Sequence, residues 1–206
     1  MQNLRGKMIV LDGPEGSGKS TQTQLLKIAL EAKGLDVLAV RDPGTTRVGE
    51  KVRGILLDPA HGEIGMRCEM LLYMAARAQM MSEVILPALE AGRIVLCDRF
   101  VSSTLAYQLG GDGMTAADIR AVAQIAIRGR WPDLTIILDM PADKSMARVK
   151  RAKDRIEQRP MDYHAQVLQN YRSQAVGNAG YRVISADRDI DAVHADVLRA
   201  VRSMNG

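Results

Sequence analysis

One short segment of the chain has the residue types and spacing that suit phosphate binding. Residues 13–20 read Gly-Pro-Glu-Gly-Ser-Gly-Lys-Ser and match the pattern G-x-x-x-x-G-K-[ST]. The glycines let successive backbone N–H groups converge on a phosphate, and the following helix N-terminus adds partial positive charge. In this pattern Lys19 reaches the β- and γ-phosphates, and the Ser20 hydroxyl binds Mg²⁺. The segment predicts a nucleoside triphosphate site formed by Gly13, Pro14, Glu15, Gly16, Ser17, Gly18, Lys19, Ser20 and Thr21.

Two acidic residues that end apolar runs are candidates for a second magnesium ligand. Asp98 follows residues 94–97, and Asp139 follows residues 135–138. We favour Asp98 because Arg99 comes directly after it, and we expect Asp139 to cap a loop. GTPases usually specify guanine with the string N-K-x-D. This string does not occur in the sequence, which counts against a GTPase.

Alternating strands and helices must position these side chains. A short continuous apolar run at 8–11 predicts a buried parallel strand, and further strands are predicted at 37–40, 94–97, 135–138 and 182–184. Helical spacing predicts helices at 20–33, 48–57, 66–91, 115–128, 142–153, 161–176 and 190–201. Pro87 should bend or break the longest of them. The alternation predicts an α/β fold whose parallel sheet is covered on both faces and binds ligands beyond the carboxyl ends of its strands.

Length and composition limit the class of protein. The chain has 206 residues, 47% hydrophobic and 25% charged, which favours a single globular domain over 1–206. Aromatic residues make up 3% and the net charge is +4, a weak basis for nucleic-acid binding but suitable for an anionic small substrate. Two cysteines form no disulfide framework, and no signal segment or run of about 20 apolar residues is present. We therefore expect a cytoplasmic protein that binds neither nucleic acid nor membrane.

A second group of motifs resembles the thymidylate kinase family. Asp98-Arg99-Phe100, followed by S-T-L-A-Y-Q at 103–108, is similar to the family's D-R-[YH] and S-[ST]-x-A-Y-Q. Further matches are R-D-P-G at 41–44, G-E-K-V-R at 49–53, A-A-R at 75–77, P-D-L-T at 132–135 and D-R-I-E at 154–157. The resemblance implies the bacterial type of the family, a P-loop NTPase-type three-layer fold with a five-stranded parallel sheet and a mobile lid, and a homodimer.

The resemblance also implies an activity, the transfer of the γ-phosphoryl group of ATP to dTMP, giving dTDP and ADP in dTTP synthesis with Mg²⁺ as cofactor. Donor and acceptor are both anions, so such a site needs several arginines to neutralise their repulsion. By resemblance, Arg99 and, more weakly, Arg53 hold the dTMP phosphate, and Arg41 is weaker still. Glu15 would accept the sugar 3′-hydroxyl and help hold the magnesium shell.

The resemblance assigns the base and sugar contacts to the rest of the motifs. Tyr73 would stack on thymine where the family usually has Phe, and its hydroxyl should reach a polar partner or lie at the pocket edge. Arg77 lies four residues further along the same helix face and would contact the base and the phosphate region. Thr104 and Gln108 would bond the pyrimidine edge, with Ser103 a weaker candidate, and Tyr107 would exclude a ribose 2′-hydroxyl. We interpret three methionines of the long helix as core filling: Met66, Met70 and Met74.

A basic run near residues 148–160 is a candidate lid. Its members are Arg148, Lys150, Arg151, Lys153, Arg155 and Arg159. Such a run is usually a solvated helix face, but its place opposite the phosphate loop favours a lid that excludes water. In one bacterial class of the family, a Gly follows the acidic residue of the phosphate loop, as Gly16 follows Glu15 here. The resemblance implies that in this class the lid supplies the stabilising arginine, and Arg148 and Arg155 best match its position. Lys19, Arg99 and Glu15 complete the predicted catalytic set.

The chain departs from the family pattern at further positions, and other functions stay open. Thr45 stands where the second glycine of R-E-P-G-G-T is usual, and Phe100 stands where Tyr or His is common. The lid is also shorter than in typical relatives. The alternatives are a kinase for another nucleotide or nucleoside, and a non-catalytic P-loop nucleotide sensor. An ATP-driven nucleic-acid protein is disfavoured by the scarce aromatics and modest charge.

Overall fold

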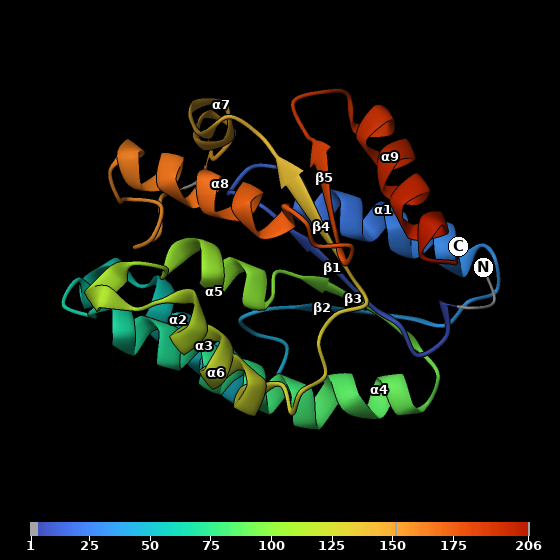
Figure 1. Cartoon of the computed structure of the whole chain (residues 1–206), viewed down its shortest axis with the longest axis horizontal. Helices are drawn as coiled ribbons and strands as arrows, with labels where there is room; N and C mark the ends of the chain where they lie inside the picture. Colours follow the sequence, from blue (N-terminus) through green and yellow to red (C-terminus); the bar gives the residue numbers. More distant parts are fainter. Residues whose placement is uncertain (1–3, 151, 206) are drawn as a thin grey trace.

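The computed structural model describes residues 4–150 and 152–205, and within them the strands form one parallel sheet (Figure 1). The strands are β1 (Met8–Asp12), β2 (Val37–Arg41), β3 (Ile94–Asp98), β4 (Leu134–Asp139) and β5 (Tyr181–Ser185). Their order across this five-stranded sheet is β2–β3–β1–β4–β5, and every neighbouring pair is parallel. All five strands predicted from the apolar runs are confirmed, with ends that extend slightly further.

Helices cover both faces of the sheet. They are α1 (Lys19–Glu31), α2 (Arg47–Leu57), α3 (Met66–Met80), α4 (Leu86–Glu90), α5 (Val101–Tyr107), α6 (Ala116–Ala126), α7 (Ala142–Ala147), α8 (Met161–Ala175) and α9 (Ile190–Arg202). Helices α1 and α9 lie on one side of the sheet, and α3, α4 and α6 lie on the other (Figure 1).

The central strand β1 shows why the fold has three layers. Its side chains alternate between two separate cores: Met8 and Val10 pack with α3, α4 and α6, and Ile9 and Leu11 pack with α1 and α9. All four side chains are fully buried, which is why the strand reads as a continuous apolar run rather than an alternating one. The result is the three-layer α/β fold of the P-loop NTPase type.

The long helix predicted at 66–91 is interrupted, as Pro87 leads one to expect. A π-helical segment, Met81–Ile85, separates α3 from α4, and Pro87 lies in the first turn of α4. Proline donates no backbone hydrogen bond and its ring crowds the carbonyl one turn earlier, so the preceding turn widens into the π form. The helix continues in nearly the same direction and so keeps α3 in place beside the sheet (Figure 1).

Two local predictions were wrong. The helix predicted at 142–153 ends at Ala147, because the basic residues after it offer almost no apolar stripe to bury and short helices are marginal without one. The segment 101–107 forms helix α5 although no helix was predicted there. Its β-branched and hydroxyl residues have modest helix propensity, and burial of Val101 and Leu105 beside α6 and α8 outweighs it.

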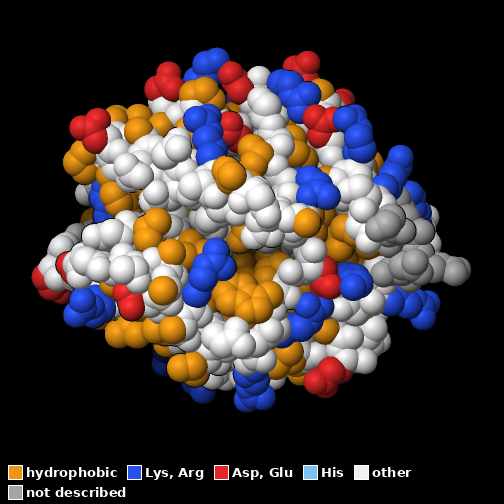
Figure 2. All heavy atoms as spheres, in the orientation of Figure 1, with side chains coloured by type: hydrophobic (Ala, Val, Ile, Leu, Met, Phe, Trp, Pro, Cys, Tyr) orange, Lys and Arg blue, Asp and Glu red, His pale blue; other side chains and the backbone are white. Residues whose placement is uncertain are grey.

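The surface carries no single dominant charge on the face drawn in Figure 2. Basic and acidic side chains are interspersed around it, and apolar side chains gather near the middle. Among residues 4–150 and 152–205, no helix is both long and apolar enough to cross a membrane.

Candidate functional site

The loop between β1 and α1, the phosphate loop (residues 13–18), depends on glycines for its shape. Gly13 and Gly16 have φ angles of +134° and +69°, which favour glycine. A Cβ on Gly13 would lie 2.5 Å from the carbonyl oxygen of Leu138, and a Cβ on Gly16 would collide with the carbonyl oxygen of Ser145. The loop therefore packs its backbone against β4 and α7, which leaves its amides close to the start of α1.

Lys19, the first residue of α1, reaches back over this loop. Its Nζ donates hydrogen bonds to the carbonyl oxygens of Gly13 at 3.1 Å and Pro14 at 2.7 Å. Burial, aided by the positive charge of Arg99, lowers the pKa of Lys19 to about 8. A buried ammonium held beside the loop amides is well placed to meet an anion.

Ser20 and Asp98 form the oxygen pair predicted for magnesium. Ser20 Oγ donates to Asp98 Oδ2 at 2.6 Å, so two hard oxygen ligands from α1 and the end of β3 meet beside the phosphate loop. Mg²⁺ prefers oxygen ligands and is usually held by one or two protein oxygens together with substrate phosphates, so the pair fits this ion. Asp139 is elsewhere engaged, in an ion pair with Arg172 at 2.9 Å.

Arg99 connects the phosphate loop with the rest of the site. Its guanidinium donates to Gly13 O at 3.1 Å and to Glu15 Oε1 at 2.8 Å. It also donates to Ser103 Oγ at 3.0 Å and to the Tyr171 hydroxyl at 3.1 Å. The backbone of Arg99 has a φ of +69°, a left-handed conformation that costs free energy in a non-glycine residue and is found most often at functional sites.

Glu15, inside the loop, is shared by two partners. Its Oε1 pairs with Arg99, and its Oε2 accepts a hydrogen bond from the Tyr107 hydroxyl at 2.6 Å. Burial alone would raise the pKa of Glu15, but the charges of Arg99 and Lys19 outweigh it, so the pKa lies below its usual value. Glu15 is therefore ionised at neutral pH, and its carboxylate faces the cavity described next.

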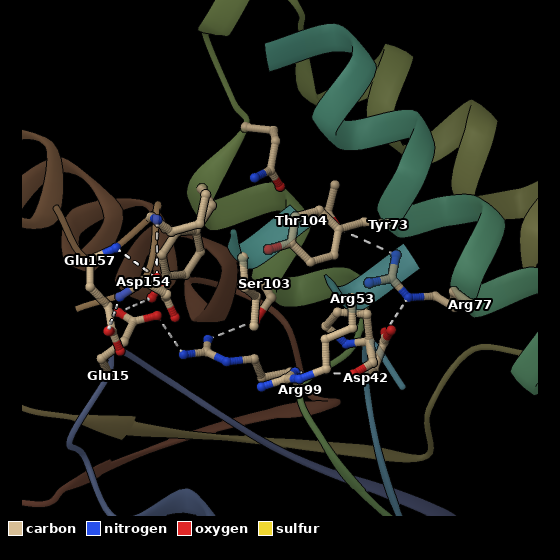
Figure 3. Close-up of a pocket in the computed structure, with 15 residues that line it drawn as sticks. Glu15, Asp42, Arg53, Tyr73, Arg77, Arg99, Ser103, Thr104, Asp154 and Glu157 are labelled. Carbon is tan, nitrogen blue, oxygen red and sulfur yellow. Dashed lines mark hydrogen bonds and ion pairs between the residues drawn. The ribbon is translucent and has the colours of Figure 1, made fainter. Parts of the chain in front are cut away.

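A cavity of about 600 Å³, counting the open space at its mouth, lies beside Arg99 (Figure 3). The lining side chains come from the phosphate loop, the ends of β2 and β3, and helices α2, α3 and α5, together with the segment before α8. They are Glu15, Asp42, Pro43, Arg53, Leu57, Tyr73, Arg77, Arg99, Ser103, Thr104, Tyr107, Gln108, Asp154, Ile156 and Glu157.

Except for Arg41, the weakest candidate, every side chain that the resemblance assigned to the substrate lines this one cavity. Tyr73 and Arg77 reach it from α3, Arg53 from α2, and Ser103, Thr104, Tyr107 and Gln108 from α5 and its end. Among the described residues the Tyr73 hydroxyl has no hydrogen-bond partner, and the ring lies at the cavity wall, which was one of its two predicted arrangements (Figure 3). Met70 and Met74 are buried and Met66 packs against the same core, as predicted.

Arg77 is held almost rigidly at the wall. It pairs with Asp42, with Nε 2.5 Å from Oδ2, and donates to Thr104 Oγ1 at 3.3 Å and to Phe100 O at 3.2 Å. Its guanidinium lies 5.2 Å from the centre of the Phe100 ring, close enough for a cation–π contact. Phe100 is fully buried, so the departure from Tyr or His at this position places an apolar ring under the arginine.

The second departure, Thr45, occupies a backbone position that suits glycine. Its φ is +69°, and its Oγ1 both accepts from Arg41 N at 2.9 Å and donates to Arg41 O at 3.0 Å. These bonds offset the strain of the left-handed conformation. Arg41 itself is exposed and pairs with Glu50 at 3.0 Å, whereas Arg53 donates to Pro43 O at 3.1 Å and lines the cavity.

The two lid arginines lie in different places. Arg148 is exposed next to the phosphate loop, where its Cβ is 3.1 Å from the position of a Cβ on Gly16. Arg155 is buried instead, donating to Leu56 O at 2.8 Å and pairing with Glu69. In this structure Arg155 thus contacts the wall around the cavity rather than the loop. Arg151 lies outside the described residues, and the described parts of 148–160 contain neither helix nor strand.

Several buried side chains of the site were not predicted, among them Asp12, Glu69 and Tyr171. Asp12 accepts hydrogen bonds from Ser102, Ser103 and Tyr171, with oxygen–oxygen distances of 2.5, 2.7 and 2.7 Å. Glu69 binds two arginines and Gln108. Glu69 lies four residues before Tyr73 on the same helix face, and that spacing was a signal that could have found it. Tyr171, from α8, carried no comparable signal.

Comparison with known proteins agrees with this geometry over nearly the whole chain. Residues 11–197 match the family model described as Thymidylate kinase. A thymidylate kinase of Pelotomaculum thermopropionicum is 45% identical over 205 residues, which cover 98% of this chain and 95% of the relative. Those of Neisseria meningitidis serogroup B and Halothermothrix orenii are 43% and 39% identical, covering 96% and 97% of this chain and 97% and 98% of the relatives. Because the match spans both the phosphate loop and the cavity, this chain belongs to the thymidylate kinase family.

Proposed function

We propose that this protein transfers the γ-phosphoryl group of ATP to the phosphate of dTMP, giving dTDP and ADP, and so serves dTTP synthesis. The observation that carries the proposal is the position of Arg99, whose guanidinium contacts Gly13 of the phosphate loop and also lines the cavity. One charged group thus joins a triphosphate site to a second site. A non-catalytic sensor needs a single nucleotide site and gives no reason for this connection.

The donor end would bind ATP through the phosphate loop. Backbone amides of the loop and the ammonium of Lys19 would hold the β- and γ-phosphates. Ser20 and Asp98 would hold Mg²⁺, whose charge offsets that of the transferring phosphoryl group when the ion is bound. Arg148, beside Gly16, is the lid residue best placed to approach the same phosphates.

The acceptor end would bind the dTMP phosphate with arginine. Arg99 is the main candidate, and Arg53 lines the same cavity from α2. A guanidinium suits this role because its planar fork can bind two phosphate oxygens at once. Glu15 fixes Arg99 from the loop side and would accept the 3′-hydroxyl of the sugar, while the ring of Tyr107 would crowd a ribose 2′-hydroxyl.

The base would occupy the end of the cavity between α3 and α5. Tyr73 would stack on the thymine ring, and Arg77, already held by Asp42 and Phe100 O, would present its remaining donor capacity to the base. Thr104 and Gln108 would bond the pyrimidine edge. Enclosure by a closing lid would exclude water, which favours transfer to dTMP over hydrolysis of ATP.

The experiment that tests this function is a coupled ADP-release assay with Mg²⁺ and ATP. dTMP, dUMP, UMP and CMP are compared at equal concentration against an ATP-only blank. We expect dTMP to give the highest kcat/KM and UMP and CMP to give little turnover. No turnover of dTMP above the blank would sink the proposal, and ATP binding without dTMP binding would favour a sensor.

We also propose that the protein is a cytoplasmic homodimer. Three apolar side chains on α2 and α3 are exposed, namely Val48 at 42%, Ile55 at 42% and Leu71 at 50%. Apolar groups gathered on one pair of helices suit an interface between two copies. Light scattering after size-exclusion chromatography should give twice the chain mass, and a monomer at micromolar concentration would contradict this part.

A further inference from the structure

A buried carboxylate, Glu69, lies behind the end of the cavity assigned to the base. It is on α3, is fully buried, and is bonded through both oxygens. Oε1 accepts a hydrogen bond from Gln108 Nε2 at 2.7 Å. Oε2 pairs with Arg155 at 2.5 Å and with Arg159 at 2.7 Å. None of these contacts is explained by the phosphoryl transfer described above.

The bond between Glu69 and Gln108 fixes which way the Gln108 amide points. A carboxylate only accepts hydrogen bonds, so the amide must turn its NH₂ group toward Glu69. The other amide atom, Oε1, is buried and has no hydrogen-bond partner among the described residues, and Gln108 lines the cavity. A buried acceptor without a partner is costly, so this oxygen is suited to a donor brought by a ligand.

In a thymine nucleotide the ring has one N–H donor, N3–H. In a cytosine nucleotide N3 carries no proton and accepts a hydrogen bond instead. An oxygen placed to bond N3–H would thus repel cytosine bound in the same pose. Sites built to hydrogen-bond one group reject ligands that leave a buried polar atom unpaired. A flipped Gln108 amide would reverse this preference, because its NH₂ group would then face the base.

The two arginines explain why the amide stays in one orientation. Arg155 and Arg159 come from the segment just before α8, and they bring two positive charges to a single buried carboxylate. Arg155 is also anchored to Leu56 O at 2.8 Å, and Arg159 lies over the Tyr163 ring at 4.6 Å. Both arginines hold Oε2 of Glu69, which leaves Oε1 to accept from Gln108.

We propose that Glu69 is a positioning residue that selects the base of the acceptor nucleotide by holding the Gln108 carbonyl toward N3. The inference rests on the proposed function, since it assumes dTMP in this cavity. It adds a specificity determinant that does not touch the substrate. It also gives Arg155 and Arg159 of the predicted lid a role at the base rather than at the phosphates.

The test replaces Glu69 by its amide isostere, Glu69→Gln, which lets the facing Gln108 amide adopt either orientation. The substrates are dTMP and the matched pair dUMP and dCMP, which both lack the 5-methyl group. We expect kcat/KM for dTMP to fall about tenfold, mostly through KM, and the dUMP-to-dCMP ratio of kcat/KM to fall at least tenfold. The control is Glu83→Gln, because exposed Glu83 accepts from Gln79 Nε2 at the same 2.7 Å and should change neither value.

A double-mutant cycle separates positioning from a general structural effect. Gln108→Leu removes the acceptor, so adding Glu69→Gln to it should change the dUMP-to-dCMP ratio less than twofold. An unchanged ratio in the single variant Glu69→Gln, or independent effects in the double variant, would overturn the inference. If thermal unfolding shows that Glu69→Gln does not fold, the variant Arg159→Gln is tested instead. We then expect the dUMP-to-dCMP ratio of kcat/KM to fall about threefold, and an unchanged ratio would overturn the inference. Failure of the wild type to phosphorylate dTMP would instead overturn the proposed function.

Discussion

The two ends of the site are built from different parts of the chain. The donor end is one continuous segment, in which Gly13 and Gly16 place backbone amides against β4 and α7 and Lys19 follows immediately. The acceptor end gathers side chains that are far apart in sequence, such as Asp42 with Arg77, and Arg155 with Glu69. One end is made of backbone and the other of ion pairs and hydrogen bonds between side chains.

This difference has consequences for how each end responds to change. Backbone amides cannot be removed by substitution, so the donor end depends on the few residues that shape it or add charge. At the acceptor end several polar side chains are held by another side chain, as Glu15 holds Arg99 and Glu69 holds Gln108. Effects there should be non-additive, and one substitution should move a neighbour's function.

The largest effect is expected at the donor end, where Lys19 donates to the loop carbonyls of Gly13 and Pro14. Lys19→Ala should lower kcat/KM for ATP on the order of 1,000-fold, because a positioned charge on the transferring phosphoryl group is lost. Lys27→Ala, on the same helix with only a 3.8 Å ion pair to Glu31, serves as the control. A loss below tenfold would mean that the loop amides suffice alone.

The next effect is expected where the two ends meet. Arg99→Ala should lower kcat/KM for dTMP at least 100-fold, about 2.7 kcal/mol at 1.36 kcal/mol per tenfold. It also leaves Glu15 without its 2.8 Å partner, so the acceptor end should lose more than one contact. Arg93→Ala, one residue before the same strand and paired with Asp36 at 3.0 Å, is the matched control. A loss under threefold would remove Arg99 from the site.

The same comparison explains how much the sequence alone could predict. The donor end could be predicted from the sequence, because a local motif between a buried strand and a helix specifies both its residues and its geometry. Ser20 and Asp98, predicted as a pair, lie 2.6 Å apart. Strands β1, β3 and β4 could be predicted because they are short apolar runs and are almost wholly buried, whereas the edge strands β2 and β5 are partly exposed and contain polar residues. Both signals lie within short, continuous stretches of chain.

The acceptor end was only partly readable, because its contacts depend on the tertiary fold. The resemblance identified nine of the 15 residues that line the cavity, but it gave no partner for Arg155, whose pairing with Glu69 spans α3 and the segment before α8. Asp12 and Tyr171 likewise meet across the chain. Helix α5 was missed for the same reason, since its burial against other elements outweighs its weak local propensity.

A smaller effect should separate the hydroxyl of Tyr107 from its ring. Tyr107→Phe removes the 2.6 Å bond to Glu15 but leaves the Arg99 contact, so kcat/KM for dTMP should fall about fivefold to tenfold. Exclusion of UMP should persist, because the ring remains. Tyr107→Ala should in contrast raise the UMP-to-dUMP ratio of kcat/KM. An equal ratio in the two variants would show that the ring does not exclude the ribose hydroxyl.

The smallest effect concerns pH and again distinguishes the two ends. Burial lowers the pKa of Lys19 to about 8, so its positive charge is present below that pH and is lost as the pH rises through it. The pH dependence of kcat/KM reports the pKa values of groups in the free enzyme, so kcat/KM for ATP should halve near pH 8 and fall further at higher pH. The measurement is made above pH 7, where a phosphate monoester with a second pKa of about 6 is already ionised. Glu15, whose pKa lies below its usual value, stays ionised across this range and should add no inflection.

Lys19→Arg should flatten the profile, because guanidinium does not deprotonate here. A wild-type profile that stays level to pH 10 would show that the lysine charge is held by more than the loop around it.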